Sequence, residues 1–263
     1  MLPAGYTFLA CPEREGGIRR MTEGSYEPHF FLSPYGKHIA GTRRDVYEKH
    51  KHILGLNCPL FDLRDIMITF MTETAYKIGT DKKMACRFMG CKSTVLSESL
   101  TDVYEECLQS YMSVAEPKAV VRKTSVSFGE DNEVIFDFGS VKSESLCKNL
   151  EGCKSAYVFA ATVGIGVDRM LKRLAVSSEA EMMVFSCIAS SGVECWCDFV
   201  NERLSEKHTL KPRFSPGYGG VSLEIQKDIL QFLDGEKMLG LTLTESLMMI
   251  PVKSVTAIVG IVE

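Results

Sequence analysis

The stretch SAYVFAAT, residues 155–162, is an almost unbroken run of apolar side chains. A strand in a half-exposed sheet alternates apolar and polar residues, whereas a strand covered on both faces is apolar throughout. This run therefore predicts a central strand with other elements packed on each face. It passes directly into VGIGVDRMLKRLA, residues 163–175, which predicts a glycine turn that opens a helix.

Helices and further strands are predicted around this segment. Apolar residues recur at helical spacing over 97–117, and 177–207 predicts the longest helix. The runs 119–128 and 133–141 are rich in β-forming residues and flank the polar turn GEDN, which predicts an antiparallel hairpin. A last strand is predicted over 253–261. Strands clustered with helices indicate an α+β domain, with a mixed or antiparallel sheet flanked by helices.

Composition restricts the class of protein. A chain of 263 residues forms one large domain or two unequal ones. Its net charge of −4 does not indicate nucleic-acid binding, which normally needs a strongly basic domain. The longest nearly apolar run, 156–167, is too short to span a membrane, and the N-terminus has no export signal, so we expect a cytoplasmic protein without a membrane partner. The ten cysteines contain no C-x-x-C pair and are expected to be mostly buried thiols, with no metal site.

The N-terminal part is the least regular. Residues 1–78 are expected to form an extension or small subdomain of unknown role, and 79–263 the main domain. Within the first part, 42–56 predicts a short charged helix. Its HKH triplet, 50–52, fits a solvated helix face better than a metal site, because no further ligands stand at suitable spacing.

The stretch KPRFSPGYGG, residues 211–220, carries the candidate chemistry. Its prolines stiffen the backbone, and its three glycines permit conformations closed to other residues. Arg213 offers a planar fork for a carboxylate or phosphate, and Tyr218 offers a ring for a cation or an adenine. Together these groups suit a zwitterionic ligand with a carboxylate, a positive centre and a flat base. A plain linking loop with a solvated arginine explains the composition equally well.

Several motifs in order resemble the activation (reactivation) domain of vitamin B12-dependent methionine synthase. In that family an R-x-x-x-G-Y loop precedes a helix, an L-T-E-S segment, a proline and S-V-[ST]. The matching residues here are Arg213, Gly217, Tyr218, Leu243 to Ser246, Pro251 and Ser254 to Thr256. Upstream, YVFAATVGIGVDRML and SGVECWCDFVNERL look like the family's central strand with its following helix, and its long helix. The resemblance covers about residues 80–263 and implies the activation-domain fold.

The resemblance also implies a ligand, S-adenosylmethionine. The family's ligand contacts fall here on Glu194, Arg213, Ser215, Gly217 and Tyr218. Arg213 would take the carboxylate, and Glu194 would favour the ammonium or sulfonium charge. Two of the family's ligand contacts have no match, namely a tyrosine from a longer C-terminal region and an acidic residue near the N-terminal helix.

The implied function is repair of inactive cob(II)alamin by reductive methylation. The chain shows no D-x-H-x-x-G pattern of a cobalamin module. It would therefore act in trans, as a free-standing component, on a separate corrinoid-binding methionine synthase chain, with a flavodoxin-like or other electron donor. The alternative is a non-catalytic module that docks a corrinoid protein without binding S-adenosylmethionine. An ordinary Rossmann-type methyltransferase is disfavoured, because the chain lacks a glycine-rich loop after a first strand followed by an acidic ribose partner. Gly164 and Gly166 do not make a dinucleotide-binding loop, because Arg169 stands where the third glycine would be.

Overall fold

The computed structural model describes residues 30–32, 38–40 and 68–262. The chain divides into two compact units, Met1–Ile68 and Thr69–Glu263. In the first unit, β1 (Phe30–Leu32) pairs antiparallel with β2 (His38–Ala40). The helix expected over 42–56, with its histidine triplet, lies outside the described residues.

The second unit begins earlier than the expected 79–263. Its first strand, β3 (Thr69–Thr72), pairs with β4 (Lys118–Ser125), and the Thr72 hydroxyl donates a hydrogen bond to the carbonyl of Pro117 at 3.0 Å. The helix α2 (Ala75–Ile78) follows and packs on the longest helix. Backbone pairing and packing therefore join residues 69–78 to the second unit.

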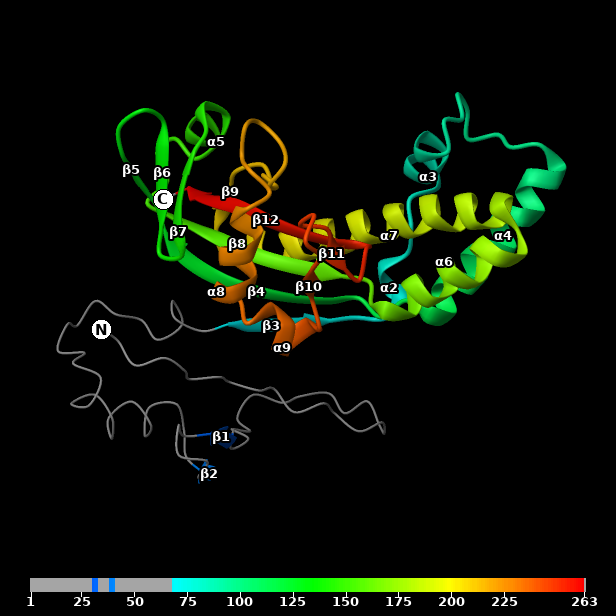
Figure 1. Cartoon of the computed structure of the whole chain (residues 1–263), viewed down its shortest axis with the longest axis horizontal. Helices are drawn as coiled ribbons and strands as arrows, with labels where there is room; N and C mark the ends of the chain where they lie inside the picture. Colours follow the sequence, from blue (N-terminus) through cyan, green and yellow to red (C-terminus); the bar gives the residue numbers. More distant parts are fainter. Residues whose placement is uncertain (1–29, 33–37, 41–67, 263) are drawn as a thin grey trace. The chain divides into compact units, whose positions relative to one another are not determined.

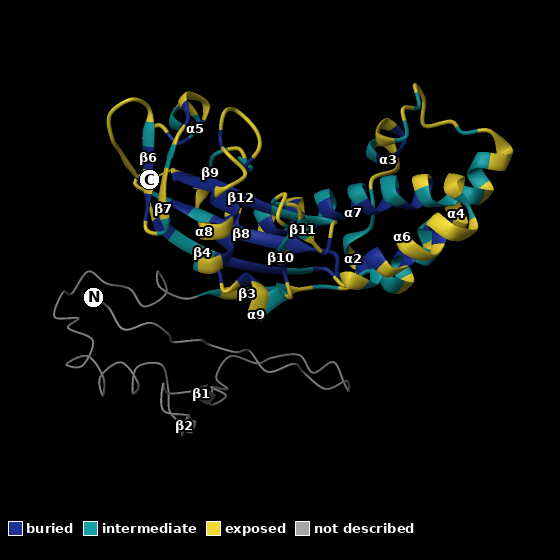
Figure 2. Ribbon diagram, in the orientation of Figure 1, coloured by how far each residue is buried: buried dark blue, intermediate teal, exposed yellow. Residues whose placement is uncertain are grey.

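The second unit is built on a five-stranded antiparallel sheet in the order β3-β4-β8-β12-β9 (Figure 1). Its middle strand, β8 (Ser155–Thr162), is the predicted central strand. On its two sides lie β4 and β12 (Ser254–Val262), and β9 (Thr209–Leu210) forms an edge. Figure 2 shows the middle of the sheet as continuously buried, which is why β8 needs apolar side chains on both faces.

Different helices cover the two faces of the sheet. The C-terminal half of α7 (Glu179–Ser205) packs Trp196 and Val200 against Phe159 of β8. The opposite face carries α8 (Ile225–Phe232) and α9 (Gly235–Leu239), which lie in front of the sheet in Figure 1. There the Arg122 guanidinium of β4 lies 4.2 Å from the centre of the Phe232 ring and donates a hydrogen bond to the Phe232 carbonyl.

The N-terminal half of α7 belongs to a second core outside the sheet. It packs with α3 (Lys82–Phe88), α4 (Glu98–Val114) and α6 (Ile165–Ser177) around Tyr111 and Phe185. Among the described helices, α7 alone is long and apolar enough to cross a membrane, but 56% of its most apolar stretch is buried within the protein. Packing in two cores therefore accounts for its composition.

The predicted hairpin differs in its extent. β4 continues the main sheet, while a separate three-stranded sheet is formed by β5 (Ser127–Phe128), β6 (Glu133–Phe136) and β7 (Gly139–Lys142). The expected strand 133–141 is broken at Asp137, whose carboxylate accepts hydrogen bonds from the Ser125 amide at 2.9 Å and the Thr124 hydroxyl at 3.1 Å. These long-range bonds fix a turn that local β-propensity does not reveal. The sheet leads into α5 (Glu144–Asn149).

Candidate functional site

The 211–220 segment follows the edge of β12 before it turns away. The Lys211 amide donates to the Gly260 carbonyl at 2.8 Å, and Phe214 and Ile258 exchange two backbone hydrogen bonds of 2.9 and 2.8 Å. Neighbouring residues of an extended segment point to opposite sides. Arg213 accordingly reaches α7 on one side, whereas the Phe214 ring lies near Ser145 of α5 on the other.

Arg213 is held by α7. Its Nη2 lies 2.6 Å from Oε2 of Glu194 and 3.6 Å from Oδ1 of Asp198, one helical turn further on. The Arg213 side chain is only 21% exposed. Its Nη1 is buried and makes no hydrogen bond within the described residues. Since buried donors are nearly always paired, this unsatisfied nitrogen is an unusual feature of the loop.

The part of α7 that carries Glu194 is fixed by two long-range contacts. The buried Ser191 hydroxyl accepts a hydrogen bond from the Asp81 amide at 2.8 Å and donates one to the Asp81 carbonyl at 2.9 Å, which ties the start of α3 to α7. The indole of Trp196 donates to the Lys118 carbonyl of β4 at 3.0 Å. Glu194 therefore stands on a rigid element, at the junction of the two cores.

Cys197 lies at the base of this charged group. Burial raises the pKa of its thiol to about 12, and the Glu194 and Asp198 carboxylates act in the same direction while the Arg213 guanidinium opposes them. All three charges thus lie within electrostatic range of one buried sulfur atom. A proton held so firmly makes this thiol a poor nucleophile.

The end of the segment is a pair of tight turns. Ser215 to Tyr218 has proline second and a glycine third, Gly217 with φ of 89°, as a type II turn requires. The Tyr218 amide donates to the Ser215 carbonyl at 3.4 Å, and Val221 closes the next turn by donating to the Tyr218 carbonyl at 3.0 Å. Tyr218 stands at the apex with 73% of its surface exposed. The stiff backbone therefore presents an aromatic ring to solvent.

Two side chains of the neighbouring elements anchor this loop. The Ser143 hydroxyl, which also caps α5, donates to the Gly219 carbonyl at 2.6 Å. The Asn149 amide donates to the Pro212 carbonyl at 3.1 Å. Gly219 has φ of 56°, and a Cβ there would lie 2.7 Å from Cζ of Phe214. Only glycine fits this position without displacing its neighbours.

No known family model and no curated protein matches the chain. A search of solved structures finds the MetH reactivation domain bound to AdoHcy, at 15% sequence identity and a TM-score of 0.58, covering 73% of this chain and 78% of that one. The chain has a reactivation-domain fold. The expected α+β class with a sheet flanked by helices is thereby confirmed.

In this reactivation-domain fold, the expected site residues form two groups. Arg213 and Glu194 are in direct contact, although 19 positions separate them. Ser215, Gly217 and Tyr218 form the turn beyond the Phe214 bridge. The L-T-E-S segment begins with Leu243, the last residue of β10 (Thr242–Leu243), and continues into the turn that leads to β11 (Met249–Ile250). The 211–220 loop instead runs beside Ile258 and Gly260 of β12.

Sequence reasoning missed Asp198, the second carboxylate facing Arg213. The signal was present, because Asp198 follows Glu194 by four positions and such residues share a helix face.

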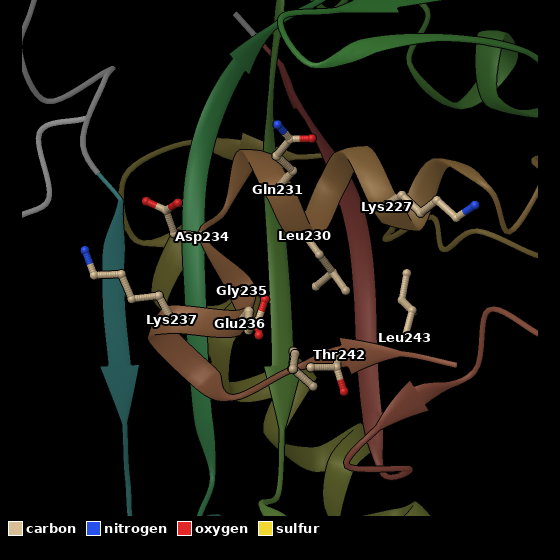
Figure 3. A pocket seen from close by; sticks show the side chains of 10 residues that line it. Lys227, Leu230, Gln231, Asp234, Gly235, Glu236, Lys237, Thr242 and Leu243 are labelled. Carbon is tan, nitrogen blue, oxygen red and sulfur yellow. The ribbon is translucent and has the colours of Figure 1, made fainter. Parts of the chain in front are cut away.

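A separate open hollow of about 750 Å³ lies between α8, α9 and β10 (Figure 3). Its lining combines apolar side chains with charges of both signs and includes none of the expected site residues: Lys227, Leu230, Gln231, Asp234, Gly235, Glu236, Lys237, Leu241, Thr242 and Leu243. This mixture selects no ligand chemistry, so the Arg213 region is the better candidate.

Proposed function

We propose that this chain binds S-adenosylmethionine between α7 and the 211–220 loop. One observation carries the proposal: the Arg213 guanidinium lies against Glu194 with an Nη1 that has no hydrogen-bond partner among the described residues, in a loop that exposes the ring of Tyr218. The reactivation-domain fold supports it, because the similar solved structure binds AdoHcy, the demethylated form of the same compound.

The residues present fit the parts of this ligand. Arg213 would bind the methionyl carboxylate through its guanidinium, and Glu194 would attract the ammonium or sulfonium group. Backbone groups at Ser215 and Gly217 approach the ligand, where the turn leaves no bulky side chain in the way. The Tyr218 ring contacts the sulfonium or the adenine. When bound, S-adenosylmethionine supplies an electrophilic methyl group.

The proposed role is that of a reactivation component acting in trans. A separate corrinoid-binding methionine synthase chain would hold the cobalamin, and a flavodoxin-like or other protein would supply the electron. Within this chain, α7 and the loop would hold the methyl donor, and the exposed Tyr218 stands where a docking partner could cover it. The fold supports this role because the similar structure is a domain of MetH.

The alternative is a module that docks a corrinoid protein without S-adenosylmethionine. One observation favours it: Nη2 of Arg213 is already engaged by Glu194 at 2.6 Å. In such a module the ion pair would be a structural link between the loop and α7.

Calorimetric titration of the purified chain with S-adenosylmethionine tests the proposal. We expect saturable binding that weakens by about 10- to 150-fold in Arg213→Ala, the equivalent of about 1.5–3 kcal/mol for a hydrogen bond to a charged group. The control is Arg203→Ala, which removes an arginine of α7 that pairs with Glu206 on the surface. It should leave the affinity unchanged.

Two outcomes would count against the proposal in different ways. If Arg213→Ala binds S-adenosylmethionine with unaltered affinity, the assignment of the site would be refuted but binding of the ligand would stand. An absence of binding by the wild-type chain at millimolar S-adenosylmethionine would refute the ligand and favour the docking module. If binding is found, absorbance changes of a cob(II)alamin-loaded partner, with reductant and the chain added, test the role in trans.

A further inference from the structure

Two carboxylates face the single positive charge of Arg213. Glu194 and Asp198 stand one turn apart on α7, and both lie within 4 Å of the same guanidinium nitrogen. One cation and two carboxylates leave this cluster with a formal charge of −1. Elsewhere on α7, Arg203 pairs with the single carboxylate of Glu206.

The two carboxylates have different geometry. Glu194 makes a hydrogen bond of 2.6 Å to Nη2 and is 34% exposed. Asp198 lies at 3.6 Å from the same atom, too far for a hydrogen bond, and is 68% exposed. Glu194 therefore orients the arginine, whereas Asp198 mainly adds negative charge beside it.

We propose that Asp198 is a specificity-determining residue that makes this site prefer S-adenosylmethionine over S-adenosylhomocysteine. The inference rests on the proposed function and deepens it. S-adenosylmethionine carries a carboxylate, an ammonium and a sulfonium, for a net charge of +1. S-adenosylhomocysteine has a neutral thioether sulfur and a net charge of zero. The two compounds offer almost the same hydrogen-bonding groups, so charge is what the protein can use to separate them.

The excess charge sets the direction of the preference. The ligand's own carboxylate and ammonium can exchange with Glu194 and Arg213, and this exchange is the same for both compounds. The remaining carboxylate, Asp198, then faces a sulfonium in one case and a neutral sulfur in the other. A site with this excess of negative charge binds the methyl donor more tightly and releases the demethylated product more readily.

The exposure of Asp198 limits the size of the effect. A charge as exposed as that of Asp198 contributes about three- to fivefold to the affinity for a nearby opposite charge, and salt screens it. Removing Asp198 should therefore change the ratio of the two dissociation constants by about this factor at low salt.

The test compares both ligands by calorimetry on wild type, Asp198→Asn, Asp198→Glu and Glu179→Gln. We expect Asp198→Asn to weaken S-adenosylmethionine binding by about three- to fivefold and to leave S-adenosylhomocysteine binding unchanged, with the difference shrinking in 0.5 M salt. Asp198→Glu keeps the charge and should keep the preference. Glu179→Gln removes a charge from the same helix about 28 Å from Asp198 at 1.5 Å per residue, beyond the reach of screened electrostatics, and should change neither affinity.

The outcomes separate the inference from the function on which it rests. Equal weakening of both ligands in Asp198→Asn would show that Asp198 positions the arginine and would overturn the inference, as would no change in either. In both cases the proposed function stands. A wild-type chain that binds neither compound would overturn both.

Discussion

Replacement of Gly219 by alanine tests whether the loop has the close packing described above. The new Cβ would lie 2.7 Å from Cζ of Phe214 and 2.8 Å from Cβ of Ser145, and both neighbours are anchored, by the Ile258 bridge and by α5. Forced overpacking of this kind costs about 1–3 kcal/mol. Alanine at φ of 56° adds about 1–2 kcal/mol of backbone strain, offset by about 0.4–1 kcal/mol from the less flexible unfolded chain. We therefore expect a loss of about 2–4 kcal/mol in the free energy of unfolding, measured by equilibrium urea denaturation.

The matched control is Gly220→Ala, one residue further on. Gly220 has a φ of 80°, but nothing lies within 4 Å of the position its Cβ would take. It shares the backbone strain without the overlap, so its loss should be about 0.5–1 kcal/mol. The difference between the two variants isolates the packing of the loop on Phe214 and Ser145. Equal losses would refute the described packing, because strain alone would then explain both.

Two further predictions concern α7. Gly192→Ala would place a Cβ into the hydroxyl group of the buried Tyr111. The free energy of unfolding should fall by about 1–3 kcal/mol in thermal unfolding, although alanine has the better helix propensity. An unchanged or higher melting temperature would contradict the described contact of α4 with α7. Cys197 keeps its proton up to about pH 12 when folded but ionises near pH 8.5 when unfolded, so above about pH 9 the native state binds more protons and stability falls with pH. Cys197→Ala should reduce this fall by up to about 1.4 kcal/mol per pH unit between pH 9 and 11, and identical slopes in urea titrations of both proteins would contradict the burial of this thiol.

Local sequence patterns predicted the elements whose packing follows from the hydrophobic pattern of their own residues. β8 was placed correctly because an apolar strand with no polar alternation must be covered on both faces. α4 was placed correctly by its apolar spacing, and its end coincides with the approach of Pro117. The break in 133–141 was not predicted, because Asp137 is held by residues 12 and 13 positions away. Local propensity carries no signal for such bonds.

In the candidate site too, features set by neighbouring residues could be predicted, and features set by distant residues could not. The turn from Ser215 to Tyr218 could be predicted, since its central residues are proline followed by glycine. That Arg213 and Glu194 belong to one site was expected only through a family resemblance, and their direct contact was not expected. It depends on the register of Phe214 on Ile258 and on the anchoring of α7 by Trp196, and neither is visible in a short stretch of sequence.

The ion pair between Arg213 and Glu194 is compatible with a ligand site as well as with a structural link. The pair is partly buried, with Arg213 21% and Glu194 34% exposed, so removing one partner leaves the other charge uncompensated and costs free energy. A ligand that brings both a carboxylate and a cationic centre avoids this cost, since each protein charge exchanges one opposite partner for another. A ligand with only one of the two charges would break the pair without replacing it. At the proposed site we therefore expect whole zwitterions to bind better than compounds that carry only one of the two charges, and the pair would keep Arg213 oriented in the absence of ligand.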